Sequence, residues 1–223
     1  MKIKICGLFR EEDIGFANEA MPDYVGFVFA ESRRQVSPVK AAKLREGLSA
    51  GILPVGVFVN TPISGIAALC RDGVIALVQL HGAEDPPYIA ALRERCATPV
   101  IKAVSVWSRD AITAWDRSGA DFLLLDNGPG GTGTRFNWDL MGTLETGGGA
   151  DGPERADRRP IGNILENLKT PCFLAGGIDR YTIETALLFR PYGIDVSSGA
   201  ETGGVKDREK MTELVWRVRR MGV

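Results

Sequence analysis

The chain has 223 residues, of which 44% are hydrophobic and 25% charged, the composition of an ordinary globular protein with room for one domain of barrel size. A formal net charge of -1 makes nucleic acid an improbable partner, since proteins that bind it carry a strong basic excess. No apolar run reaches the roughly 18 residues of a membrane span, and no secretory signal is expected, so a cytoplasmic protein without membrane contact is predicted.

Eight short apolar runs rich in Val, Ile and Phe are predicted to be strands. Most are nearly continuous rather than alternating, which is typical of strands buried on both faces of a parallel sheet. They cover residues 2–6, 24–29, 53–59, 74–80, 99–104, 121–125, 171–175 and 193–197.

Longer segments with apolar residues every three to four positions separate these strands and are predicted to be helices. Several begin with Asp, Ser or Pro, as helices commonly do. They cover residues 10–20, 38–48, 64–73, 86–96, 109–119, 161–169, 180–190 and 207–222.

Repeated strand–helix units form right-handed parallel crossovers, and eight of them close into a (β/α)8 TIM barrel. We therefore expect a single α/β domain over residues 1–223. The alternative is a doubly wound open sheet, which usually has fewer strands and a glycine-rich turn after the first one. Here a single glycine, Gly7, follows the first strand.

The segment 142–160 breaks this pattern because it is rich in glycine, proline and charge. We interpret it as a loop insertion between strands 6 and 7, after a helical turn at 137–142. Connections from a helix back to a strand lie on the face of a barrel opposite the active site, so this loop is predicted to lie away from the chemistry.

The first and sixth strands end in side chains suited to proton transfer. Cys6 ends the first strand and Asp126 the sixth, at the end of the barrel where barrel enzymes hold their active sites. A thiolate and a carboxylic acid could serve as base and acid on two atoms of one substrate. Alternatively, Cys6 is only a small apolar residue.

Glycine-rich turns after the seventh and eighth strands predict a phosphate site. "AGGI" contains Gly176 and Gly177, and "SSGAE" contains Ser198 and Gly199. Their backbone N–H groups can surround a phosphate at the position where barrels often bind one. The alternative is two turns that need glycine for steric reasons.

"GPGGTG", at 128–133, matches the dinucleotide fingerprint but lacks the acidic residue expected about 20 positions later, and no Lys-Ser/Thr follows as in a Walker loop. A glycine-rich flap over the site is the better interpretation.

Three further residues have a functional and a structural interpretation. His81, the only histidine, is either a catalyst or a hydrogen-bonded structural residue. Arg34 is either a bidentate carboxylate ligand or a solvated surface cation. Lys102, inside the fifth strand, could form a Schiff base, as in aldolases.

Nine short motifs, in order along almost the whole chain, lead to one family. They are "KICG", "VGFVFAESRRQVSP", "VGVFVN", "QLHG", "IKAVSV", "LLLD", "GGTGTRFNW", "LAGGI" and "DVSSGAE…GVKD". Together they resemble the phosphoribosylanthranilate isomerases of tryptophan biosynthesis, a part of aromatic amino-acid biosynthesis.

This resemblance implies a (β/α)8 barrel without cofactor or metal that performs an Amadori rearrangement. N-(5-phosphoribosyl)anthranilate would become 1-(o-carboxyphenylamino)-1-deoxyribulose 5-phosphate, with Cys6 as general base and Asp126 as general acid. Arg34 would hold the anthranilate carboxylate. The substrate pocket would also include His81, Asp195, Gly176, Gly177, Ser198 and Gly199.

The chain departs from the family at Asn137, where "FDW" is usual, and through the insertion at 142–160. Asparagine still caps a helix, so little loss is expected from it. The partner would be a small phosphosugar–anthranilate molecule, and the protein a monomer or homodimer.

Three alternatives remain at the level of the sequence. One is a dual-substrate sugar isomerase of the histidine and tryptophan pathways, although its relatives carry aspartate where this chain has Cys6. The others are a lyase that uses Lys102 and a phosphate-ligand binding protein without catalysis.

Overall fold

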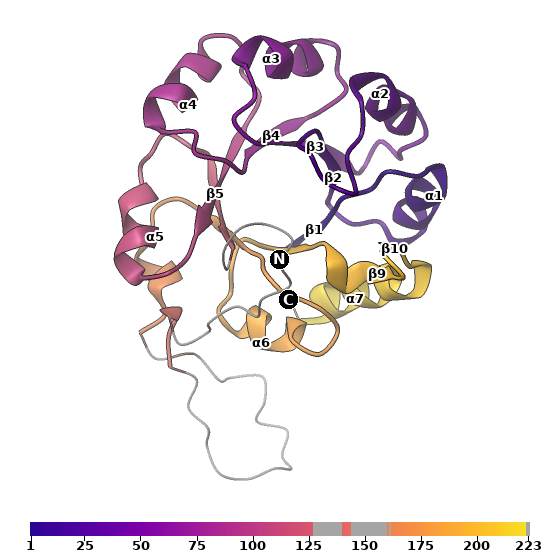
Figure 1. Cartoon of the computed structure of the whole chain (residues 1–223). Coiled ribbons are helices and arrows are strands. Elements are labelled where there is room, and N and C mark those ends of the chain that lie inside the picture. The colour runs from indigo at the N-terminus through magenta and orange to yellow at the C-terminus, as the bar shows by residue number, and fades with distance from the viewer. Residues whose placement is uncertain (127–139, 144–159, 161, 222–223) are drawn as a thin grey trace.

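Eight parallel strands close into a ring in chain order, and helices surround it (Figure 1). The computed structural model describes residues 1–126, 140–143, 160 and 162–221. The predicted (β/α)8 barrel is confirmed. Its strands are β1 Lys2–Cys6, β2 Tyr24–Val28, β3 Leu53–Phe58, β4 Leu77–Leu80, β5 Val100–Ser105, β6 Phe122–Asp126, β7 Cys172–Leu174 and β8 Gly193–Val196.

The helices begin where capping residues stand in the sequence. The hydroxyls of Ser37 and Ser108 and the carboxylate of Asp85 accept backbone N–H bonds from the first turns of α2, α5 and α4. The helices are α1 Glu11–Ala20, α2 Pro38–Glu46, α3 Ile63–Arg71, α4 Pro86–Arg93, α5 Arg109–Trp115, α6 Ile183–Leu188 and α7 Arg208–Met221.

The helix predicted at 161–169 is wrong: the described part of this segment holds one 3-10 turn, η3 Ile164–Asn167. The chain becomes extended at Leu168, with φ −83° and ψ 140°. The Asp116 carboxylate then accepts the N–H groups of Lys169 and Thr170. These contacts hold the chain in position to enter β7, so a helix does not continue through Leu168 and Lys169.

Two predictions fall largely outside the described residues. Of the insertion at 142–160, only residues 142, 143 and 160 are described, so its placement as a loop stays a prediction. The glycine-rich segment 128–133 and Asn137 lie wholly outside.

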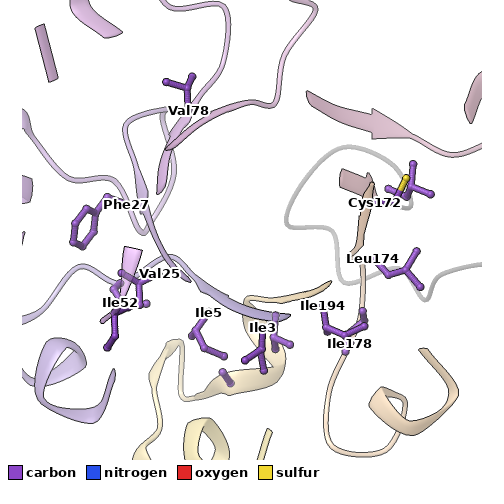
Figure 2. Packing of buried hydrophobic residues seen from close by; sticks show 14 of the residues in the cluster. Ile3, Ile5, Val25, Phe27, Ile52, Val78, Cys172, Leu174, Ile178 and Ile194 are labelled. Carbon is purple, nitrogen blue, oxygen red and sulfur yellow. The ribbon is translucent and has the colours of Figure 1, made fainter. Parts of the chain in front are cut away.

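Alternate residues of strands β2 to β7 belong to two separate hydrophobic clusters, whereas β1 and β8 contribute only to the outer one. The outer cluster packs between strands and helices; it includes Ile3, Ile5, Phe27 and Leu174, whose side chains lie outside the ring in Figure 2. The inner cluster fills the barrel and contains Tyr24, Val55, Leu77, Ile101, Ala103, Leu124, Phe173 and Ala175. Because successive side chains of a strand point to opposite faces of the sheet, this alternation decides which side chains can reach the interior of the barrel.

A small hairpin after β8 was not predicted from the sequence. It follows the 3-10 turn η4 Ser198–Ala200 and consists of β9 Glu201–Thr202 and β10 Val205–Lys206. Gly203 and Gly204 form its turn, both with positive φ. Lys206 pairs with Glu201 across the hairpin, so an acid and a base stand opposite each other.

Among the described residues, no helix is both long and apolar enough to cross a membrane.

Candidate active site

Polar side chains form the upper layers of the barrel interior, at the carboxyl ends of the strands. Their positions follow from strand alternation, because residues two apart share a face. The inward-facing series are Lys4 and Cys6 on β1, Leu77, Gln79 and His81 from β4, Leu124 and Asp126 on β6, and Gly193, Asp195 and Ser197 from β8.

Cys6 lies at the top of β1 with only 8% of its surface exposed. Gly7, directly after it, has φ +85°, and a Cβ added there would lie 2.4 Å from Cδ of Arg34. Only glycine permits both this backbone and the guanidinium stem above it. The order Cys-Gly therefore places Arg34 next to the thiol.

A buried ion pair lies below this thiol. Lys4 Nζ is 2.9 Å from Asp195 Oδ1, and both side chains are almost fully buried. Burial alone would lower the pKa of Lys4, but Asp195 and Cys6 together raise it, so Lys4 stays a cation. Asp195, predicted to line the pocket, thus lies inside the barrel as the partner of Lys4.

The pKa of Cys6 is raised above its ordinary value. Burial is the main cause, and the nearby Asp195 adds to it, while Lys4 and Lys206 act in the opposite direction. The thiol is therefore mostly protonated at neutral pH. Anything that brings a cation nearer or removes water changes its ionised fraction.

His81 and Asp126 come together across β5. His81 Nε2 lies 3.5 Å from Asp126 Oδ2, and His81 Nδ1 lies 2.9 Å from Gln79 Nε2. Because the amide nitrogen of Gln79 donates, Nδ1 accepts and the neutral ring carries its proton on Nε2, facing the carboxylate. Asp126 stands on the opposite side of the mouth from Cys6, with β7 and β8 between them on the shorter way around the ring.

Lys102 does not face the barrel interior. It alternates with Ile101 and Ala103 of the inner cluster and shares its face with Val100 and Val104 of the outer cluster. Its Nζ lies 2.7 Å from the Gly82 carbonyl and 3.1 Å from Glu84 Oε2. This geometry opposes the Schiff-base alternative and indicates a structural role, because Lys102 fixes the loop that follows His81.

The two predicted phosphate loops touch each other. A Cβ at Gly199 would lie 2.0 Å from the Ile178 carbonyl, so the loop after β8 packs directly on the loop after β7. Gly176 and Gly177 both have positive φ, and Ser198 begins η4 with an exposed side chain. The loops can therefore direct backbone N–H groups at a common point.

Glu201 is a site residue that the sequence analysis missed. Its carboxylate, almost fully buried, accepts Nε and Nη2 of Arg34 at 2.7 and 2.9 Å and Nζ of Lys206 at 2.6 Å. The Gly-Gly turn between Thr202 and Val205 was the one available signal, because it predicts a hairpin that would return Lys206 to Glu201.

Within the described ranges, no cluster of three or more His, Cys, Asp or Glu side chains could hold a metal ion.

Comparison with known proteins gives a consistent result. Residues 3–217 match the family model described as N-(5'phosphoribosyl)anthranilate (PRA) isomerase. An N-(5'-phosphoribosyl)anthranilate isomerase from Endomicrobium trichonymphae is 44% identical over 96% of both chains.

Solved structures agree with this match. The phosphoribosyl anthranilate isomerase of Thermus thermophilus is 31% identical, covers 99% of this chain and 100% of its own, and has a TM-score of 0.81. A second isomerase structure, 29% identical with a TM-score of 0.75 and 99% of each chain covered, contains reduced 1-(o-carboxyphenylamino)-1-deoxyribulose 5-phosphate. The chain belongs to the N-(5'-phosphoribosyl)anthranilate isomerase family.

Proposed function

We propose that this chain converts N-(5-phosphoribosyl)anthranilate to 1-(o-carboxyphenylamino)-1-deoxyribulose 5-phosphate, with Cys6 as general base and Asp126 as general acid. The observation that carries the assignment of residues is the arrangement of Cys6, Arg34 and Asp126 around one barrel mouth, in a chain that belongs to this family.

The first step is ring opening. Asp126 gives its proton to the furanose oxygen, the bond from that oxygen to C1 breaks with its electrons on oxygen, and the anthranilate nitrogen forms an iminium with C1. His81, 3.5 Å from Asp126, stabilises the carboxylate that remains.

The second step removes the proton on C2. The thiolate of Cys6 takes it, the C–H electrons form the C1–C2 double bond, and the iminium electrons return to nitrogen. The enolamine then loses its hydroxyl proton and gains one at C1, which gives the ketone, and proton exchange with water returns Asp126 and Cys6 to their starting forms. The iminium makes C2 acidic enough for a base that is mostly protonated at rest.

Binding groups lie on both sides of these reacting atoms. Gly176, Gly177, Ser198 and Gly199 offer N–H groups and a hydroxyl to the phosphate. On the other side, Arg34 would bind the anthranilate carboxylate through paired N–H groups.

Loss of the fluorescence of N-(5-phosphoribosyl)anthranilate tests this function. Purified protein should accelerate the loss in proportion to its concentration, and the product should be the ketose. A rate equal to that of buffer alone would overturn the proposal. The oligomeric state, monomer or homodimer, stays a prediction.

A further inference from the structure

The carboxylate of Glu201 contacts three cationic side chains. Besides Arg34 and Lys206, Arg33 Nη2 lies 2.6 Å from Oε2. The side chains of Glu201 and Lys206 are 3% and 0% exposed, whereas that of Arg33 is 57% exposed. Three cations around one carboxylate leave an excess of positive charge beside the thiol.

The contacts of Arg34 use only one edge of its guanidinium. Nε and Nη2 donate to the two carboxylate oxygens of Glu201, which leaves the second edge, Nη1 and Nη2, available for another planar anion. The stem of Arg34 lies over Gly7, so the group can swing little.

From this geometry we infer that Glu201 is a positioning residue that fixes Arg34 so that its second edge meets the substrate carboxylate, and thereby determines specificity for a carboxylated aryl amine. This inference rests on the proposed function and adds a residue to it.

Glu201 is itself held rigidly. Lys206 Nζ donates to it and also to the Ser197 carbonyl at 3.0 Å, while Lys210 Nζ binds the Glu201 carbonyl at 2.6 Å. The hairpin that carries Glu201 and Lys206 is therefore anchored to the end of β8 and to α7, and this anchoring fixes where Glu201 holds Arg34. A fixed donor loses less conformational entropy when it binds a carboxylate than a free side chain does.

Two possible roles of Glu201, reducing the positive field or positioning Arg34, predict opposite effects of Glu201→Gln on KM. If Glu201 only reduces the positive field, its neutralisation should strengthen binding of the anionic substrate and lower KM. If Glu201 positions Arg34, the glutamine amide faces the guanidinium with its own N–H groups, Arg34 moves, and KM should rise.

The test compares two substrates on each variant: N-(5-phosphoribosyl)anthranilate and N-(5-phosphoribosyl)aniline, which lacks the carboxylate. The ratio of their kcat/KM values does not depend on the fraction of folded enzyme. A charged bidentate contact gives roughly a 10- to 150-fold preference in the wild type. Glu201→Gln should reduce this preference about tenfold or more, chiefly through KM for the carboxylated substrate.

Two further variants separate position from charge. Glu201→Asp keeps the charge but is too short for the same paired contact, and should reduce the preference as well. Arg33→Ala, the matched control, removes the exposed partner of the same carboxylate and should leave the preference within about threefold.

An unchanged or larger preference in both Glu201 variants, or no preference in the wild type, would overturn the inference. Absence of any turnover by the wild type would instead overturn the proposed function.

Discussion

The thiol of Cys6 is subject to opposing influences. Burial and Asp195 favour its protonated form, while Lys4 and Lys206 favour the thiolate. In the proposed mechanism, a thiol that is mostly protonated at rest would still serve as a base, because bound substrate would exclude water and bring the acidic C2 proton to it. With Cys6 as the base, the residues around it would decide the pH range of the reaction.

Replacement of Cys6 tests its role directly. General acid–base steps typically contribute about 10²–10⁴ in rate, so Cys6→Ala should lower kcat by at least that order. Cys6→Ser should be nearly as damaging, because a hydroxyl supplies almost no oxyanion near pH 7. Steady-state kinetics measure both. If Cys6→Ser kept more than about a tenth of the activity, the thiol would not be the base.

Lys4 should set the position of the ascending limb of the pH–rate profile. Lys4 lowers the pKa of Cys6, so Lys4→Met should raise that pKa, reduce the thiolate fraction at any given pH, and move the limb to higher pH. The position of the limb is independent of the amount of folded protein. Lys2→Met is the matched control, because Lys2 lies on the same strand but its side chain pairs with Asp23. This variant should leave the limb in place. A limb that stays fixed in Lys4→Met would contradict this role.

Among the elements, strands were predicted more accurately than the segments around them. Nearly continuous apolar runs located all eight strands, because both faces of each strand are buried. The same reasoning placed Cys6, Asp126 and the glycine turns at the correct end of the barrel.

The errors concern elements whose form depends on distant contacts. Segment 161–169 has helical periodicity, yet Asp116, some fifty positions earlier, holds its end extended. Glu201 and Arg34 are 167 positions apart, and no local pattern links them. The outward orientation of Lys102 depends on which alternate residues of β5 face the barrel interior. A continuous apolar run does not show this, because a shift of one residue exchanges the two faces of the strand.

The insertion at 142–160 allows a prediction at the scale of an element. Glycine, proline and charge dominate it, and a loop of this composition is expected to tolerate change. Replacement of residues 147–157 by a short Gly/Ser linker should leave kcat within a few-fold of the wild type, as measured with the fluorescence assay. A loss of a hundredfold or more would mean that the segment contributes to the site.

At the scale of the whole molecule, ring closure couples the loops that would hold the substrate. β1 pairs with β8, and α7 packs on α1, so both ends of the chain share one barrel. A ligand that touches loops after β1, β2, β6, β7 and β8 should therefore stabilise the entire domain.

Thermal unfolding can measure this coupling. A ligand at about 100 times its Kd stabilises by about 2.7 kcal/mol, which for a domain of this size raises Tm by roughly 5–11 °C. We expect reduced 1-(o-carboxyphenylamino)-1-deoxyribulose 5-phosphate to shift far-UV circular dichroism and tryptophan fluorescence curves together. A second unfolding transition whose midpoint does not shift with the ligand would contradict a single domain.

The pairing of β1 with β8 also has a consequence during synthesis. β8 leaves the ribosome about 190 residues after β1, some 10–40 s later at 5–20 residues per second. Until then one edge of "KIKIC" has no partner strand and is open to pairing with other chains. Lys2 and Lys4 alternate along this edge and, as charged residues, oppose such pairing. Lys4→Met should therefore form more aggregate during translation than during dilute refolding, and equal aggregation in both would argue against a protective role on the nascent strand.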